Sequence, residues 1–248
     1  MGERQELIAI IAAMEDEMAP LRQRLVGETE IADGPRRYYE GRLRGVSVVL
    51  AVTGEGKRNA DVGIRRLIQK CNPTRVLAIG LGGSLSPKLR VGEILVSSEV
   101  MEGDQILGWP DLQWLEEAHV DIEYDLGRMV TVDEILSTPE SKEEWWGRTA
   151  RDQPAIADME SACFARVAIA YNVPYLVVRA VSDSSDEVLP HFLEDCRSQD
   201  GSIDRRQVMW KAFWRPKSWG ILFKLRRRIE QLTVRLADFA EHLVAALA

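Results

Sequence analysis

Three acidic residues follow apolar, strand-like segments of this chain. Glu17 comes shortly after the apolar run at residues 6–13, and Glu160 and Asp183 follow two later runs of the same kind. Carboxyl groups in such places can act as general acids or bases. Each also has a structural interpretation, because an acid favours a helix N-terminus and an aspartate can close an Asx turn. Taken singly, each acid leaves both interpretations open.

Other common chemistries lack their sequence motifs. The chain has no GxxxxGK[ST] loop, no strand followed by GxGxxG, no HExxH and no GxSxG. The three histidines are far apart, which argues against a triad or a histidine metal cluster: His119, His191 and His242. The three cysteines form no CxxC pair and fit a reducing cytoplasm: Cys71, Cys163 and Cys196. We expect no cofactor and no metal.

The segments that must position the three acids alternate between strand and helix patterns. Strands are predicted at residues 6–13, 38–44, 46–53, 75–80, 93–100, 155–158 and 175–181, and helices at 57–70, 139–151 and 160–171. A polar loop is expected around 103–128, followed by an apolar segment at Thr131–Leu136. The alternation predicts one α/β domain, a central mixed sheet flanked by helices, with its ligand site at the strand ends.

The C-terminal part of the chain has a different pattern. Residues 190–217 are loop-like, and Ser218 can cap a long helix that runs to the C-terminus. Apolar residues recur along this helix at spacings of three and four, which predicts one apolar stripe: Leu222, Leu225, Ile229, Leu232, Leu236, Phe239 and Leu243. We therefore divide the chain into an α/β domain at 1–189 and a loop and helix at 190–248, packed on or extending that domain.

Charge is distributed unevenly along the chain. The net charge is −7, yet residues 205–235 hold ten basic side chains and one acidic one, interleaved with tryptophan and phenylalanine. Such a segment packs on the body or on a second subunit, or lies peripherally on an anionic membrane. The acidic remainder argues against nucleic acid as a partner.

The sequence predicts a cytoplasmic protein. The longest stretches without charge have twelve residues, at 76–87 and 167–178, which is shorter than a membrane span of roughly 18 residues. Acids flank the first apolar run, so no secretory signal is expected.

Three segments together resemble the superfamily of nucleoside phosphorylases and nucleosidases that includes the methylthioadenosine/S-adenosylhomocysteine nucleosidases. They are IAIIAAMEDEMAPL, IGLGGSLSPKLRVGEILVSSEV and IADMESACFARVAIAYNVPYLVVRAVSDSSDE, within residues 6–188. The tail, with DEVLP and WRPKSWGILFKL, is similar to hopanoid-associated phosphorylases, which act on adenosylhopane. The resemblance implies a nucleoside phosphorylase-like fold, a nucleoside substrate and a homo-oligomer, with a dimer favoured.

The resemblance also implies roles for the acids. Glu17 is expected near the attacking water, Glu160 on the ribose hydroxyls, and Asp183 as the proton donor to purine N7. Met159 is expected under the sugar. The remaining substrate-binding residues implied by the match are Gly80, Leu81, Ile135, Leu136, Asp158 and Ser182.

The chain departs from the family pattern at several positions. Ala78 and Leu81 replace an arginine and a hydroxyl residue of the phosphorylases, so water is favoured over phosphate, although Lys57 or Arg58 offers charge by another route. Ile135 replaces a phenylalanine that stacks on adenine, and Asp158 replaces a glutamate.

The leading hypothesis is an enzyme that cleaves the N-glycosidic bond of an adenine nucleoside with an apolar 5′ substituent, adenosylhopane being one candidate. The alternatives are a methylthioadenosine/S-adenosylhomocysteine nucleosidase, a phosphate-using purine nucleoside phosphorylase, and a nucleoside-binding protein without activity.

Overall fold

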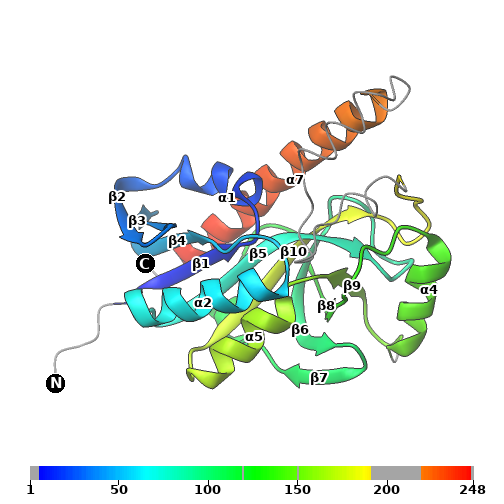
Figure 1. The fold of residues 1–248 in the computed structure, drawn as a ribbon, viewed down its shortest axis with the longest axis horizontal. Helices are drawn as coiled ribbons and strands as arrows, with labels where there is room; N and C mark the ends of the chain where they lie inside the picture. Colours follow the sequence, from blue (N-terminus) through cyan, green and yellow to red (C-terminus); the bar gives the residue numbers. More distant parts are fainter. Residues whose placement is uncertain (1–5, 119, 150, 191–218, 247–248) are drawn as a thin grey trace.

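The computed structural model describes residues 6–118, 120–149, 151–190 and 219–246 (Figure 1). In chain order the elements are β1 (Ile8–Ala12), α1 (Glu15–Arg22), β2 (Val26–Asp33), β3 (Arg36–Leu43), β4 (Val46–Val52), α2 (Lys57–Cys71), β5 (Arg75–Ser84), β6 (Ile94–Glu102), β7 (Gln105–Gly108), α3 (Gln113–Ala118), β8 (Asp125–Thr131), α4 (Pro139–Arg148), β9 (Ala155–Asp158), α5 (Ser161–Ala170), β10 (Tyr175–Asp183) and α7 (Trp219–Ala245).

The ten strands in the described residues form one mixed sheet. Its order is β10-β6-β8-β9-β5-β1-β4-β3-β2, with β7 beside β6. An additional parallel pairing joins β10 to β5, so the strands β5, β10, β6, β8 and β9 close on themselves. This closure brings the ends of β5, β9 and β10 together, although they are far apart in sequence.

Helices cover both faces of the sheet (Figure 1). On one face, α2 and α5 pack on a core that contains Ile11, Ile64 and Phe164. On the other face, α1, α3 and the C-terminal half of α7 pack on a core that contains Ile10, Trp114 and Phe239. The prediction of a mixed α/β single-domain fold with a long C-terminal helix is confirmed.

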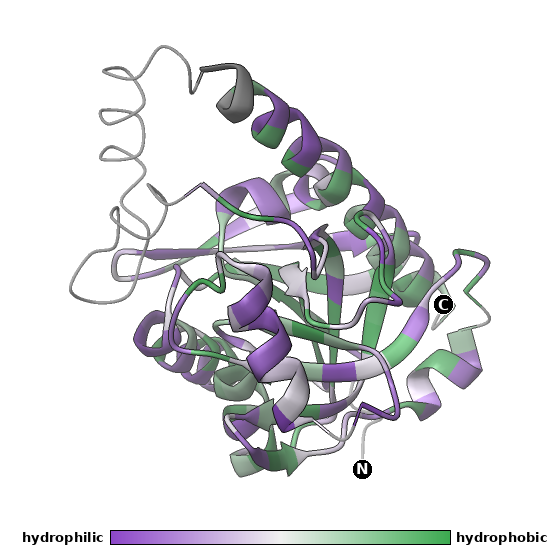
Figure 2. Cartoon of the chain, turned by 90° about the vertical axis from the view of Figure 1, so that its right-hand side faces the viewer, coloured by the Kyte–Doolittle hydropathy of each residue, from purple (hydrophilic) through white to green (hydrophobic). Residues whose placement is uncertain are grey.

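The apolar stripe of α7 is buried only in its C-terminal half. Leu232, Leu236, Phe239 and Leu243 are nearly inaccessible, whereas Leu225 and Ile229 are half-buried. Toward its N-terminus the helix projects from the body, and its ribbon alternates between hydrophilic and hydrophobic residues (Figure 2). Residues 191–217 of the predicted loop lie outside the residues that the structure describes, and the side chain of Leu222 is not described either. The division at residue 190 stays a prediction.

Some local predictions were incomplete. The edge strand β2 was missed because its sequence VGETEIAD is almost entirely exposed and has no apolar alternation. The region expected as a polar loop contains β7 and α3. In α3, Trp114 and Leu115 are buried, although acidic residues follow them in the sequence. The strand near Thr131–Leu136 is β8, which ends at Thr131, and the residues after it form the loop that leads to α4.

Candidate active site

Glu17 lies at the N-terminal turn of α1, directly after β1. Its Oε2 accepts a hydrogen bond from the Met14 amide at 3.0 Å, so it caps its own helix. Its Oε1 accepts one from the Leu81 amide of β5, also at 3.0 Å. Burial raises the pKa of Glu17 above its ordinary value, against the lowering effects of Arg179 and of these amides. Glu17 therefore stabilises the start of α1 and also provides a buried carboxyl group with a raised pKa.

Glu160 is held at the N-terminus of α5. Its Oε1 accepts a hydrogen bond of 2.9 Å from the Gly56 amide, in the turn that starts α2. Burial raises the pKa of Glu160 to about 7, and the charges of Asp158 and Glu17 add to this effect. Two carboxyl groups close enough to interact thus share one end of the site.

A buried arginine organises the same end. The Arg179 side chain forms an ion pair with Asp158, with Nη2 and Oδ2 2.7 Å apart, and both side chains are at most 3% exposed. Asp158 also accepts hydrogen bonds from Thr131 Oγ1 at 2.9 Å and from the Ser161 hydroxyl. Both oxygens of Asp158 therefore have protein partners, which fits an internal support for Arg179 better than direct substrate binding.

The glycines of β5 allow these groups to approach. A Cβ atom on Gly80 would lie 3.1 Å from both Glu17 Oε1 and Arg179 Nη1. A Cβ atom on Gly83 would lie 2.9 Å from Asp183 Oδ2. One glycine-rich strand thus runs beneath Glu17 and Arg179 at one position and beneath Asp183 at another.

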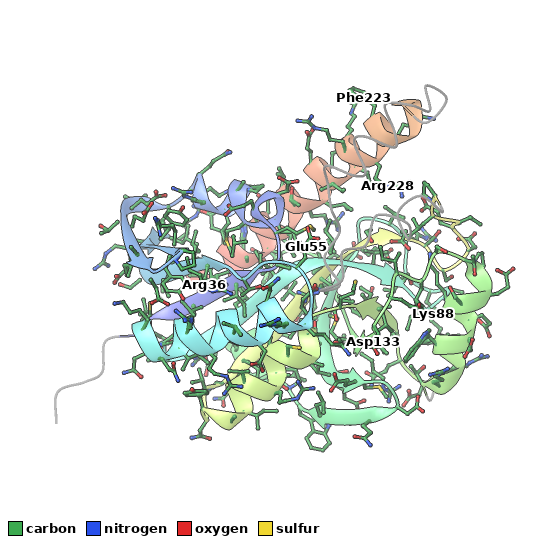
Figure 3. All side chains as sticks on the ribbon, in the orientation of Figure 1. Arg36, Glu55, Lys88, Asp133, Phe223 and Arg228 are labelled. Carbon is green, nitrogen blue, oxygen red and sulfur yellow. The ribbon has the colours of Figure 1, made fainter. Side chains whose placement is uncertain are left out.

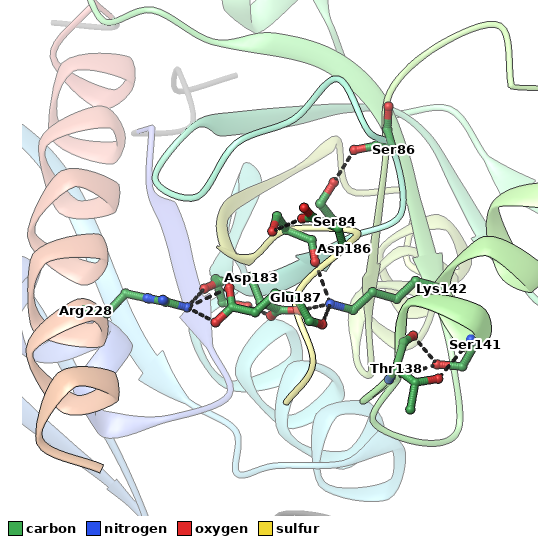
Figure 4. A network of polar contacts seen from close by, with 11 residues as sticks. Ser84, Ser86, Thr138, Ser141, Lys142, Asp183, Asp186, Glu187 and Arg228 are labelled. Carbon is green, nitrogen blue, oxygen red and sulfur yellow. Dashed lines mark hydrogen bonds and ion pairs between the residues drawn. The ribbon is translucent and has the colours of Figure 1, made fainter. Parts of the chain in front are cut away.

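Asp183, at the end of β10, forms an ion pair with a lysine from α4. Lys142 Nζ lies 2.6 Å from Asp183 Oδ2, and the Lys142 side chain is 1% exposed. The Ser182 hydroxyl donates to the other oxygen, Oδ1, at 2.5 Å. Figure 4 shows this ion pair within a network of polar contacts that reaches α7. Asp183 is therefore held mainly by charged and hydroxyl side chains, whereas backbone amides hold Glu17 and Glu160.

The sequence profile of the Phosphorylase superfamily matches residues 7–206. The chain belongs to the phosphorylase superfamily. A curated relative from Anoxybacillus flavithermus, a 5′-methylthioadenosine/S-adenosylhomocysteine nucleosidase, is 33% identical over 71% of this chain and 84% of its own length. The nucleosidase of that name from Geobacillus thermodenitrificans is 31% identical over 72% of this chain and 84% of its own length.

Two solved structures share the fold of this chain. The S. pneumoniae 5′-methylthioadenosine/S-adenosylhomocysteine nucleosidase matches with a TM-score of 0.75 at 20% identity, over 98% of this chain and 100% of the other. A futalosine hydrolase mutant from Helicobacter pylori matches with a TM-score of 0.73 at 19% identity, over 96% and 98%. The prediction that the chain is an enzyme of the nucleosidase or nucleoside phosphorylase type is confirmed.

Three other residues that the sequence predicts to bind substrate lie next to Glu160 or in the loop that leads to α4. Met159 is half-buried immediately before Glu160. Ile135 is half-buried in the loop between β8 and α4, and Leu136 is buried in a small core with Trp146. The Leu189 amide ties the segment after β10 to this loop through the Ser137 carbonyl, 2.8 Å away.

The groups considered for phosphate binding are placed differently. Ala78 is 1% exposed within the core beneath α2 and α5, so its replacement of an arginine says little about the site. Lys57 forms ion pairs with Glu102 at 3.1 Å and with Asp133 at 2.6 Å. Asp133 lies in the loop after β8 (Figure 3). Arg58 is exposed. The charge of Lys57 is already balanced by two carboxylates.

Sequence reasoning missed the two buried cations of the site. Arg179 gave a signal, because it is a lone charge within the apolar strand segment YLVVRAV and must have a partner when buried. Lys142 gave none, since it stands next to Glu143 and Glu144 in a polar helix and resembles a solvated side chain.

The described residues contain no group of three or more His, Cys, Asp or Glu side chains placed to hold a metal ion. Within the same part of the chain, no helix combines the length and apolar character needed to cross a membrane.

Proposed function

We propose that this protein hydrolyses the N-glycosidic bond of an adenine nucleoside. The observation that carries the proposal is the placement of Glu17 and Asp183 along one glycine-rich strand, Glu17 with a raised pKa and Asp183 at a fixed strand end. Cleavage of this bond passes through a cationic sugar, so it needs a base for water and an acid for the leaving purine.

The proposed step uses these two groups at opposite sides of C1′. The oxygen of water bonds to C1′ while its proton passes to Glu17. Asp183 enters this step as the neutral acid. The C1′–N9 bond breaks, its electron pair goes to the purine, N7 takes the proton of Asp183, and Asp183 is left as the carboxylate paired with Lys142. Glu17 and Asp183 then exchange protons with solvent, and the net reaction is nucleoside plus water to purine plus sugar.

Glu160 and Met159 are proposed to hold the sugar. Burial raises the pKa of Glu160 to about 7. In its ionised form the carboxylate accepts a hydrogen bond from a ribose hydroxyl. The half-buried Met159 side chain precedes it and offers an apolar surface for the ring. Gly80, Leu81 and Ser182 complete the frame, while Ile135 and Leu136 are proposed to contact the base.

Water is the proposed nucleophile. A phosphate ion needs positive charge and hydroxyl donors. Leu81 provides neither in its side chain, and Lys57 is paired with Glu102 and Asp133. The alternative, a phosphate-using phosphorylase, requires Lys57 or Arg58 to turn toward the ion.

Two classes of 5′ substituent remain to be separated. The names of the curated relatives favour a methylthio or homocysteinyl group. For an apolar substituent such as that of adenosylhopane, the candidate place is a cavity of about 430 Å³, where Pro87, Leu89 and Val91 line the wall together with Arg90 and the polar residues 184–186.

A substrate panel separates these classes. The purified protein is incubated with methylthioadenosine, S-adenosylhomocysteine, adenosine and a 5′-alkyl adenosine, with and without phosphate. We expect adenine release from at least one 5′-substituted nucleoside. Binding of these nucleosides without release of adenine supports the non-enzymatic alternative and overturns the proposal.

We propose that the protein is a homodimer. The support is a group of exposed apolar side chains near β7 and α5, namely Ile106, Trp109 and Ile169. Light scattering at micromolar concentration checks this, and a monomer at that concentration contradicts it.

We also propose that the protein is cytoplasmic and that residues 205–235 contact the inner membrane peripherally. The described part of this segment presents an exposed Phe223 at the projecting end of α7 (Figure 3), followed by exposed Lys224, Arg226 and Arg227. Residues 205–218 lie outside the described residues. Co-sedimentation with phosphatidylglycerol vesicles should be salt-sensitive and absent with neutral vesicles. Equal sedimentation with both vesicle types contradicts the proposal.

A further inference from the structure

The segment from Ser182 to Glu187, which contains Asp183, is held by cations from two different helices (Figure 4). From α4, Lys142 Nζ donates to Asp183 Oδ2 at 2.6 Å, to the Ser184 carbonyl at 2.6 Å and to the Glu187 carbonyl at 3.0 Å. These three acceptors match the three N–H donors of an ammonium group. Lys142 can therefore be buried with its charge compensated, and it fixes the segment at three points.

The second cation comes from α7. Arg228 Nη1 donates to the Ser182 carbonyl at 3.2 Å and to the two carboxylate oxygens of Glu187 at 2.7 and 3.0 Å. Arg228 thus contacts the residue before Asp183 and the residue that closes the segment. Figure 3 shows Arg228 on the part of α7 nearer the body and Phe223 farther out. We call Lys142 and Arg228 the cation clamp.

The clamp leaves the two oxygens of Asp183 unequal. Oδ2 is fixed by the buried Lys142 ammonium, whereas Oδ1 accepts from the Ser182 hydroxyl, whose hydrogen can rotate away. Oδ1 is therefore the oxygen that can change partner when a purine binds.

We propose that Lys142 and Arg228 are positioning residues for leaving-group protonation: together they fix the Ser182–Glu187 segment so that Asp183 presents Oδ1 to the departing base. This inference rests on the proposed nucleosidase function. Neither cation touches the reacting atoms in this account, and both act through Asp183. The cost of a misplaced acid is large because proton transfer requires contact at hydrogen-bond distance.

The test compares a purine nucleoside with 4-nitrophenyl β-D-riboside, whose leaving group departs without a proton. Lys142→Met removes the ammonium group and keeps most of the length of the side chain. Arg228→Gln removes the charge of the second cation and shortens its side chain. The matched control is Arg226→Gln, since Arg226 lies on the same helix, is 80% exposed and pairs with Glu230.

For Lys142→Met we expect kcat on the purine nucleoside to fall about 100-fold, and kcat on 4-nitrophenyl riboside to fall by less than about threefold. For Arg228→Gln we expect the same selectivity with a fall of about tenfold on the purine nucleoside, because Lys142 still holds Asp183. The control should match the wild type on both substrates. An equal fall on both substrates, or no fall on the purine nucleoside, overturns the inference.

Hydrogen exchange at residues 184–189 provides a readout that does not depend on activity. Loss of either cation should speed amide exchange in this segment at least about tenfold, with exchange in β1 unchanged. If the wild type cleaves no nucleoside, the proposed function fails, and unchanged exchange in the variants then overturns the clamp as well. If Lys142→Met does not fold, Arg228→Gln decides, because its side chain is 35% exposed.

Discussion

The two ends of the candidate site are built by different means. At the Glu17 and Glu160 end, backbone amides of Leu81 and Gly56 hold the carboxyl groups, and burial raises the pKa of both. At the Asp183 end, the carboxylate is paired with a buried lysine. The first arrangement raises the proton affinity of both acids, and the second holds the carboxyl group of Asp183 in one orientation.

This difference suggests a division of labour. A base that activates water needs a raised proton affinity, which burial supplies. A group that meets a leaving purine needs a defined position, which ion pairing supplies at the cost of a buried charge pair. The two ends should therefore respond differently to leaving group and to pH.

The largest expected effect is at Asp183. Asp183→Asn should lower kcat on a purine nucleoside about 100- to 10,000-fold, because the amide cannot give up a proton readily. Lys142 keeps two carbonyl acceptors, so the variant should fold with a lower Tm. Cleavage of 4-nitrophenyl riboside should be largely retained. Activity on the purine nucleoside within tenfold of the wild type removes Asp183 from the mechanism.

The next effect is at Glu17. Glu17→Gln retains an oxygen that can accept from the Leu81 amide, but it cannot take a proton from water. We expect kcat to fall about 100-fold on both the purine nucleoside and 4-nitrophenyl riboside, since both need activated water. Steady-state kinetics on the two substrates measures this. A fall confined to the purine nucleoside would remove the distinction between the two ends.

A smaller effect concerns the pH dependence of stability. The pKa of Glu160 is about 7 in the folded chain against an ordinary value of 4.5, so the folded state binds more protons between these values. The stabilising effect of protonation is complete below about pH 4.5 and is lost as pH rises through 7. Glu160→Gln should remove this slope, up to about 3 kcal/mol across the window.

Urea unfolding at about pH 5 and about pH 8 measures the difference between variant and wild type. Glu15→Gln, a change at an exposed glutamate of α1, is the control and should leave the slope unchanged. Parallel pH dependence in the wild type and Glu160→Gln contradicts the raised pKa.

The sequence predicted those parts of the site that lie directly after a buried strand. Glu17 and Glu160 follow buried strands, so their position after the strand ends was enough to predict both at the edge of the sheet where the ligand site lies, and each begins a helix there. The position of Asp183 at the end of β10 followed from the same reasoning.

The sequence did not predict the contacts that depend on closure of the sheet. Pairing of β10 with β5 brings Arg179 over Gly80 and Asp183 over Gly83, and no local pattern specifies that pairing. Lys142 becomes buried only because the segment after β10 folds back onto α4.

The identity of the sugar product tests most directly whether the protein hydrolyses the N-glycosidic bond with water. A phosphate-free reaction with the best nucleoside of the substrate panel is followed by proton NMR, in parallel with one that contains phosphate. We expect equimolar adenine and free sugar in both reactions, at the same rate. Turnover that requires phosphate and yields a sugar 1-phosphate would contradict this expectation.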